Sequence, residues 1–318
     1  SHRPVRPHPM QEQNEVPLPL AYRAYRRLIS YYKLREHSRW SFGRLAVEGS
    51  IIVLTRLGAM IGGWRFPERA IGGWWWIWRW RWEVISGWLD YETVRWCRRL
   101  VRPGTTVLDI GAHIGYYSRL LSQLVGSDGL VIAYEPCPEN FPILQVNLGA
   151  AEFHNAVPVQ VACSNRTGNA RLFVSPGHSN HSLKAGYTQT DETVEVETIS
   201  VDDHLAKQGH RQIHFAKLDT EGAEIEVLKG MRRTIAQSQD LAIVVELNPT
   251  ALKAAGHSPQ DLIRLINDLG LDPREIASNG YLDKPDLSKQ RDTRNLLCMS
   301  PEKWKAIDKT DVNKLDGA

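Results

Sequence analysis

The chain has 318 residues, of which 42% are hydrophobic and 24% are charged, and it contains 24 Gly and 17 Pro. These values are close to those of ordinary globular proteins, so they exclude a disordered, collagen-like or disulfide-knot chain. The net charge of +3 hides a division, because residues 1–102 hold 18 Lys and Arg against 8 Asp and Glu. In the remaining residues, acidic side chains outnumber basic ones.

Residues 1–87 are expected to form a basic N-terminal extension. Residues 1–17 contain four prolines among polar residues, which predicts a loose arm. Residues 20–40 place apolar side chains at helical spacing with basic residues between them, which predicts an amphipathic basic helix.

The cellular compartment is predicted from what the sequence lacks. The four cysteines lie far apart, with no C-x-x-C pair and no histidine at metal-ligand spacing, which argues against a zinc site or a redox motif. No secretory signal and no run of about 18 apolar residues is present. We therefore expect a cytoplasmic protein without a transmembrane segment.

A tryptophan-rich segment closes the extension. Five tryptophans stand at every second position, namely Trp74, Trp76, Trp78, Trp80 and Trp82. This period of two predicts a β-strand with the five indoles on one face. Core packing or a homodimer interface is one interpretation of that face, and a platform for sugar rings or peripheral contact with a membrane is the other. Nucleic acid is disfavoured, because the acidic remainder of the chain would repel a phosphate backbone.

After residue 103 the pattern alternates between strands and helices, which predicts an α/β fold with a doubly wound, mostly parallel sheet. The expected core strands are 106–110, 130–134, 157–161, 213–218, 241–247 and 295–299. The expected helices between them are 117–125, 139–148, 224–229 and 259–269. Two further alternating strands, 171–174 and 193–199, are expected to form an inserted β-hairpin. The α/β domain is expected to cover residues 88–300, with a polar tail over 301–318.

A glycine loop follows the first core strand in the sequence V-L-D-I-G-A-H-I-G, residues 107–115. A dinucleotide fold would have G-x-G-x-x-G there, and its second glycine lets a pyrophosphate approach the backbone. His113 stands in that place, which disfavours NAD and FAD. A nucleoside without phosphates, such as S-adenosylmethionine, suits the loop better. Glu135 follows Gly115 by 20 residues, at the end of the second strand, where an acidic residue can bind both ribose hydroxyls.

Several motifs in this order resemble the FkbM family of S-adenosylmethionine-dependent methyltransferases, over residues 88–249. The glycine loop, with His113 where the family usually has Asn, is followed by Y-E-P (134–136), A-C-S-N-R-T-G (162–168), K-L-D-T-E-G-A-E (217–224) and V-V-E-L (244–247). The resemblance implies a seven-stranded class I methyltransferase sheet and methyl transfer to a hydroxyl of a sugar, glycoconjugate or natural product. The cofactor contacts that it implies are Asp109, Gly111, Ala112, His113, Gly115, Tyr116, Glu135, Ser164, Asn165 and Asp219, with Asn165 standing where the family usually has Asp.

Methyl transfer is an in-line displacement, in which positioning contributes more to the rate than a general base does. Asp219 ends a core strand, where ligands gather in an open α/β sheet, so it is a candidate base or clamp on the acceptor hydroxyl. Its alternative role is to cap the following helix. His181 and Glu246 are further catalytic candidates, and the candidate substrate contacts are Glu92, His178 and Glu221.

Two alternatives to an O-methyltransferase stay open. One is an N-methyltransferase acting on a small molecule, and the other is a non-catalytic scaffold that presents the Trp- and Arg-rich front as a binding surface. The spacing of the carboxylates does not require a metal, so a divalent ion is neither predicted nor excluded. The acceptor itself is not identified by the sequence.

Overall fold

The computed structural model describes residues 53–66, 74–175, 181–188, 192–209, 212–288 and 293–310. The expected arm over 1–17 and the expected basic helix over 20–40 lie outside these residues. The chain divides into two compact units, one made of Ser1–Arg39 with Trp304–Ala318 and the other of Trp40–Lys303. The fold and the site below belong to the unit Trp40–Lys303.

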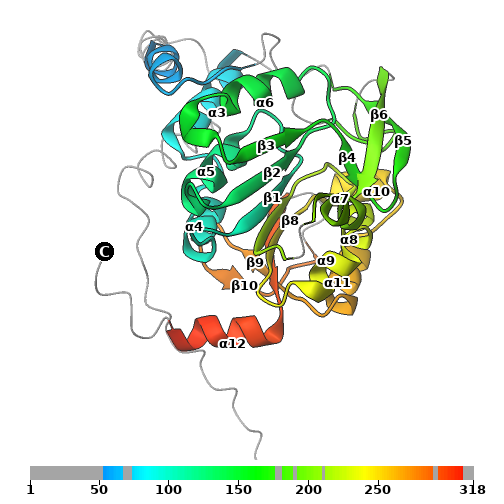
Figure 1. Ribbon diagram of the computed structural model, residues 1–318. Helices are drawn as coiled ribbons and strands as arrows, with labels where there is room; N and C mark the ends of the chain where they lie inside the picture. The colour runs from blue at the N-terminus through cyan, green and yellow to red at the C-terminus, as the bar shows by residue number, and fades with distance from the viewer. Residues whose placement is uncertain are drawn as a thin grey trace, which may run out of the picture. The chain divides into compact units, whose positions relative to one another are not determined.

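The core of this unit is an eight-stranded sheet in the order β10-β9-β11-β8-β7-β1-β2-β3 (Figure 1). Its strands are β1 (Thr106–Ile110), β2 (Leu130–Tyr134), β3 (Ala156–Val159), β7 (Phe215–Leu218), β8 (Ala242–Leu247), β9 (Asp272–Ile276), β10 (Leu282–Asp283) and β11 (Arg294–Met299). The strands from β3 to β8 pair in parallel, whereas β11 runs antiparallel to both β8 and β9. The predicted mostly parallel α/β sheet is confirmed, and the two-residue β10 adds an eighth strand at its edge.

Helices cover both faces of the sheet, which is why its central strands are apolar on both sides. In Figure 1, α4 and α5 lie on one side of the central strands, and α8, α9 and α11 lie on the other. A helix over residues 53–61 precedes the other described helices. These are α3 (Trp74–Ser86), α4 (Tyr91–Leu100), α5 (Tyr116–Val125), α6 (Phe141–Leu148), α7 (Val201–Gln208), α8 (Glu224–Lys229), α9 (Arg232–Gln237), α10 (Pro249–Ala254), α11 (Pro259–Asp268) and α12 (Pro301–Thr310), with a short 3₁₀ helix over Ala151–Phe153. None of the described helices combines the length and the apolar character needed to cross a bilayer.

A second, three-stranded sheet contains the predicted hairpin. Strands β5 (Gly168–Phe173) and β6 (Thr193–Ser200) pair antiparallel, and β4 (Ala162–Ser164) lies parallel to β6 on its other side. The segment between β5 and β6 contacts the main sheet. There the hydroxyl of Ser182 donates a hydrogen bond to the carbonyl oxygen of Glu221 over 2.6 Å. The hairpin is thereby tied to the loop that follows β7.

The predicted tryptophan strand is wrong, because residues 74–86 form helix α3. The backbone N–H and C=O groups of a strand form hydrogen bonds with a neighbouring strand, whereas those of a helix form hydrogen bonds within the helix. No strand among the described residues pairs with this segment. Successive residues of a helix are rotated by about 100°, so a period of two does not place residues on one face of a helix as it does on a strand. Trp82 packs edge-on against Trp88 with ring centroids 6.3 Å apart.

Candidate functional site

A cavity of about 270 Å³ opens at the carboxyl ends of β1, β2 and β7. From β1 the chain continues outward through β2 and β3 in one direction, while β7 and β8 extend the sheet in the other. Open α/β sheets bind ligands where their strand order reverses in this way. The cavity therefore lies where the fold favours a binding site.

The glycine loop after β1 is packed directly onto the end of β7. Gly111 has a φ of 86°, a backbone conformation that residues with a side chain rarely adopt. A Cβ atom on Gly111 would overlap the carbonyl oxygen of Asp219, so this position has no room for a side chain. The backbone N–H groups of Gly111 and Ala112 both donate to the carbonyl oxygen of Tyr134, over 3.0 and 2.9 Å. The loop is thus held between the ends of β2 and β7.

His113 adopts a left-handed backbone conformation in the glycine loop, although it is not a glycine. Its φ is 53°, in the left-handed region that His adopts more readily than most residues do. Its backbone N–H donates to Oε2 of Glu135 over 2.8 Å, and its ring lies 5.7 Å from that of Trp80 between centroids. Both rings line the cavity.

Glu135 is a buried carboxylate at the end of β2. Its Oε1 accepts a hydrogen bond from the backbone N–H of Cys137 over 2.9 Å, while Oε2 accepts from His113. Burial raises the pKa of Glu135 to about 7, although these hydrogen bonds act to lower it. The side chain of Asn140 also donates a hydrogen bond to Glu135. An ionised carboxylate has about four acceptor positions, so Glu135 can still accept a hydrogen bond from a ligand hydroxyl.

Two charged side chains of opposite sign form the floor of the cavity. Asp109 of β1 pairs in register with Lys217 of β7, and both side chains are buried. Asp109 accepts a hydrogen bond from the hydroxyl of Ser118 over 2.5 Å, and burial raises its pKa to about 6. The side chain of Lys217 is 1% exposed, and its Nζ lies 3.2 Å from Oδ2 of Asp219. Burial would lower the pKa of Lys217, but nearby carboxylates, above all that of Asp219, raise it above its ordinary value.

Three carboxylates stand at the mouth of β7 and β8, where Asp219, Glu221 and Glu246 have oxygens within 4.8 Å of one another. Burial and the neighbouring Asp219 raise the pKa of Glu221 to about 8 and that of Glu246 well above its ordinary value. Oε2 of Glu221 accepts a hydrogen bond from the hydroxyl of Tyr187 over 2.6 Å. Carboxylates this close disfavour one another's ionised form, so the cluster favours a cation, whether organic or metallic.

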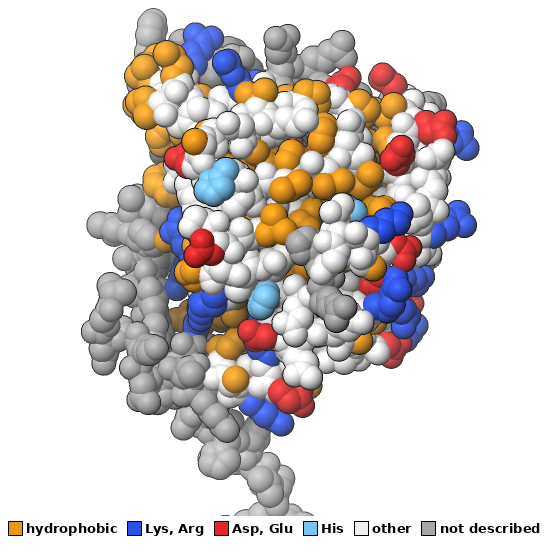
Figure 2. All heavy atoms as spheres, viewed as in Figure 1, with side chains coloured by type: hydrophobic (Ala, Val, Ile, Leu, Met, Phe, Trp, Pro, Cys, Tyr) orange, Lys and Arg blue, Asp and Glu red, His pale blue; other side chains and the backbone are white. Residues whose placement is uncertain are grey.

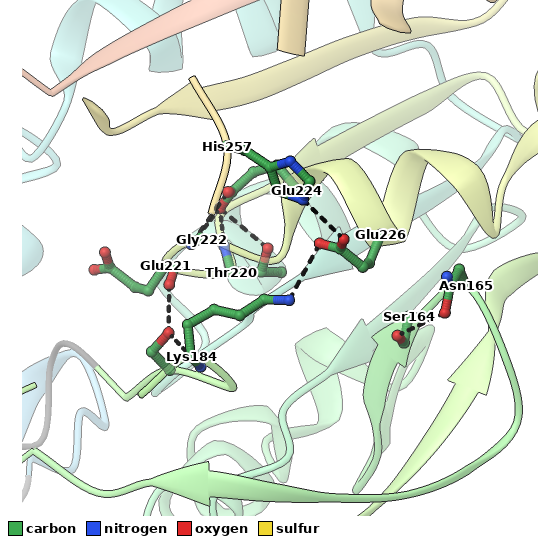
Figure 3. Close-up of polar contacts among 10 residues, drawn as sticks. Ser164, Asn165, Lys184, Thr220, Glu221, Gly222, Glu224, Glu226 and His257 are labelled. Atoms are coloured by element: carbon green, nitrogen blue, oxygen red, sulfur yellow. Dashed lines mark hydrogen bonds and ion pairs between the residues drawn. The ribbon is translucent and has the colours of Figure 1, made fainter. Parts of the chain in front are cut away.

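The turn after β7 owes its shape to Glu224 (Figure 3). Its buried carboxylate accepts hydrogen bonds from the backbone N–H and the hydroxyl of Thr220, each over 3.0 Å, and from the backbone N–H of Gly222. Glu221 lies inside this turn with a φ of 51°. Glu224 therefore fixes the loop that carries Asp219 and Glu221, and it has no direct place in the cavity lining.

Comparison with known proteins identifies the family. The family model described as the methyltransferase FkbM domain matches residues 109–273, about half of the chain. The chain belongs to the FkbM methyltransferase family. Three relatives are the hexuronic acid methyltransferase AglP of Haloferax volcanii (29% identical), the 31-O-demethyl-FK506 methyltransferase FkbM of Streptomyces tacrolimicus (27%) and the 2-O-methyltransferase NoeI of Sinorhizobium fredii (26%). The matches cover 51%, 44% and 44% of this chain, and they span 62%, 68% and 63% of the respective relatives.

Most of the residues expected from the FkbM resemblance meet in the cavity. The predicted residues that line it are Asp109, Gly111, Ala112, His113, Tyr116, Glu135, His181, Asp219 and Glu221. Glu246 lies beside the last two. His181 accepts a hydrogen bond at Nδ1 from the backbone N–H of Ser175 over 3.0 Å, which orients its ring.

Other predicted residues are not brought to the cavity of this FkbM-family chain. Gly115 instead starts α5, where a Cβ atom would lie 2.8 Å from a methyl carbon of Leu144. Ser164 and Asn165 lie apart from Glu221 in Figure 3, because β4 ends at Ser164 and the following turn exposes Asn165. Glu92 lies on α4 and does not line the cavity. His178 lies outside the described residues.

The sequence analysis missed two charged residues at the cavity, Lys217 and Asp90. Lys217 had a visible signal, since a charged residue in a short apolar strand next to Asp219 is unusual for a buried position. No pattern in the sequence marked Asp90 as a site residue. Asp90 precedes α4, and the fold brings it to the cavity. There the hydroxyl of Tyr117 donates to Asp90 over 3.3 Å, and burial raises the pKa of Asp90.

Because Gly111 is closely packed, we expect the added methyl group of Gly111→Ala to lower the free energy of unfolding strongly. Gly111→Ala adds a Cβ atom that overlaps the carbonyl oxygen of Asp219, whereas Gly104→Ala adds one with nothing within 4 Å, at a similar φ of 75°. Both variants carry the strain of the left-handed backbone, about 1–2 kcal/mol. We expect Gly104→Ala to lose about that much free energy of unfolding and Gly111→Ala to lose at least about 2 kcal/mol more. Urea unfolding of both variants measures the difference, and equal losses would show that the overlap is relieved by a small shift of the loop.

Proposed function

We propose that this chain is an S-adenosylmethionine-dependent O-methyltransferase that acts on a hydroxyl of a sugar, glycoconjugate or natural product. The observation that carries the proposal is that the glycine loop, the buried carboxylate of Glu135 and the acidic cluster around Asp219 open into one cavity. Membership of the FkbM methyltransferase family supports it. So do the relatives, since one is named for a hexuronic acid and another for a 2-O position.

The charges of the cavity match a cationic donor. Asp109, Glu135, Asp219 and Glu221 line it together with the single ammonium of Lys217, so its lining is acidic. A pyrophosphate would be repelled there, whereas a sulfonium and an α-ammonium would be attracted. The residues thus fit S-adenosylmethionine, with Glu135 placed for the ribose and the Gly111 loop and Asp109 for the methionine part. When bound, this donor supplies a methyl group activated by the positive charge on sulfur.

Asp219 is in the best position to act on the acceptor. Its side chain is 33% exposed, so an incoming hydroxyl can reach it, while its Oδ2 is held by Lys217 over 3.2 Å. One carboxylate oxygen is therefore oriented by the ammonium, and the other is available to accept the acceptor's proton or to hold its hydroxyl in line with the methyl group. Glu221, Glu246 and the ring of His181 surround this position and are the further groups that can receive a proton.

The first test measures turnover with a labelled methyl donor and a panel of sugar and natural-product hydroxyl acceptors. Once an acceptor is found, Asp219→Asn should lower kcat at least about 100-fold and leave the affinity for S-adenosylhomocysteine within about threefold, because the side chain acts on the acceptor. Asp128→Asn, an exposed carboxylate on the loop before β2, is the matched control. Unchanged kcat in Asp219→Asn contradicts its role. No affinity for S-adenosylhomocysteine would favour the scaffold, and methylation of amines alone would favour the N-methyltransferase.

Glu135→Gln tests the ribose contact. Both oxygens of Glu135 accept backbone N–H groups, so either orientation of a Gln amide would set its NH₂ against a donor. We expect the affinity for S-adenosylhomocysteine to fall at least about tenfold at pH 8.

The pH dependence adds a second readout for the same variant. The pKa of Glu135 is raised to about 7, and a ligand whose hydroxyls donate to the carboxylate prefers its ionised form. In the wild type the affinity should therefore increase as the pH rises through 7 and then level off. Titration calorimetry should show that this increase is lost in Glu135→Gln and kept in Glu139→Gln, which changes an exposed neighbour. The same pH profile in all three proteins would rule out the contact.

Lys217→Met tests the role of the buried ammonium. Lys217 lowers the pKa of both Glu221 and Glu246, so its removal raises these pKa values further. The acidic cluster then ionises at higher pH, and the acidic limb of the kcat profile should move up by about one pH unit. Lys229→Met, on the exposed side of α8, should leave the limb in place. Thermal unfolding confirms that each variant is folded, and an unmoved limb in folded Lys217→Met would show that Lys217 does not control ionisation of the site.

A further inference from the structure

A short helix over residues 53–61 carries its large apolar side chains on the outside. Seven large hydrophobic side chains are exposed in the described part of the chain, and five of them belong to this helix, namely Val53, Leu54, Leu57, Met60 and Ile61. Met60 and Ile61 are 78% and 87% exposed. At about 100° per residue, these five positions fall within an arc of about 120°, so they form one face. We call Val53, Leu54, Leu57, Met60 and Ile61 the apolar face.

The opposite side of the helix, formed by small residues, is the side that packs against the protein. Thr55 is 1% exposed, and a Cβ atom on Gly58 would lie only 2.7 Å from a methyl carbon of Ile85 in α3. The carbonyl oxygen of Gly62, just beyond the helix, accepts a hydrogen bond from the guanidinium of Arg119 over 2.7 Å. The helix is therefore held in place with its orientation set. A helix of a water-soluble domain normally turns its large apolar side chains inward, and this one does the reverse.

Figure 2 shows these side chains gathered at the upper left of the view, over the blue helix of Figure 1. The nine described residues of this helix span about 14 Å, less than half of the roughly 30 Å hydrocarbon core of a bilayer. No described helix is long and apolar enough to cross a membrane. The helix over residues 53–61 has the form of a helix that lies in the plane of a membrane surface, with its apolar side chains at the level of the headgroups and upper acyl chains.

The charge around the apolar face decides between a membrane and a second copy of the chain. Residues 53–66 contain Arg56 and Arg65 and no acidic residue. In a symmetric dimer these two arginines and their copies would be brought together and repel, whereas an anionic lipid surface attracts them. A nine-residue helix is also small for a stable dimer interface, which buries about 1,200–2,000 Å².

We propose that the apolar face docks this protein onto anionic lipid surfaces, with Met60 and Ile61 entering the headgroup region and Arg56 and Arg65 adding electrostatic attraction. The proposal rests on surface residues that do not line the cavity, so it is independent of the proposed methyl transfer.

Flotation of the full-length chain with lipid vesicles tests it, since aggregated protein sediments while vesicle-bound protein floats. The vesicles contain phosphatidylcholine alone or phosphatidylcholine with phosphatidylglycerol. We expect the wild type to float with the anionic vesicles, to float less as salt is raised, and to float poorly with phosphatidylcholine alone. Met60→Asp/Ile61→Asp should lower binding at least about tenfold.

The matched control is Val146→Asp/Val157→Asp, which makes the same change of charge at two exposed hydrophobic residues in the described part of the chain outside this helix. It should bind anionic vesicles as the wild type does, apart from a small loss common to any added negative charge. Circular dichroism verifies that both variants are folded. The proposal is overturned if the wild type does not float, if both double variants lose binding equally, or if light scattering shows a wild-type dimer that Met60→Asp/Ile61→Asp converts to monomer without any vesicle binding by the wild type.

Discussion

At the carboxyl edge of β1 and β7, one buried ammonium lies among a group of carboxylates. Lys217 interacts electrostatically with Asp90, Asp109, Asp219, Glu221 and Glu246. Buried ion pairs of this kind contribute little net stability, because the loss of hydration offsets most of the attraction. Burial and the neighbouring carboxylates raise the pKa values of Glu221 and Glu246, although Lys217 acts to lower both. The site is therefore prepared for additional positive charge, which the sulfonium of the proposed donor would bring.

The geometry of this group depends on how closely the loops after β1 and β7 approach each other. The absence of a side chain at Gly111 allows the backbone at Asp219 to lie against the glycine loop. The backbone N–H of His113 in the same loop donates to Glu135, so this loop contacts both the proposed ribose contact and the backbone at Asp219. A shift of either loop would move both contacts together. Glu224 holds the β7 side of this arrangement through the Thr220 and Gly222 backbone.

The two proposed binding surfaces differ in charge. The acidic part of the sequence includes the cavity, whose carboxylates suit a cationic small molecule. The basic part includes the helix over 53–61, whose outward apolar face suits an anionic lipid surface. Opposite charges on separate surfaces would allow one protein to bind both proposed partners without competition between them.

The sequence by itself determined the α/β fold, the hairpin insertion, the family and nine of the residues that line the cavity. It could do so because strand–helix alternation and the ordered motifs around Gly111, Glu135 and Asp219 are local patterns. The sequence analysis missed β9, because its sequence Asp-Pro-Arg-Glu-Ile contains a proline, which cannot donate a hydrogen bond to a sheet. The strand forms beside β11 near the edge of the sheet, where its other neighbour is the two-residue β10. Only the tertiary structure decided that the tryptophan segment is a helix, that Asp90 and Lys217 reach the cavity and that Asn165 does not. Each of these outcomes depends on which partner the fold supplies, and a periodicity within one segment carries no information about its partner.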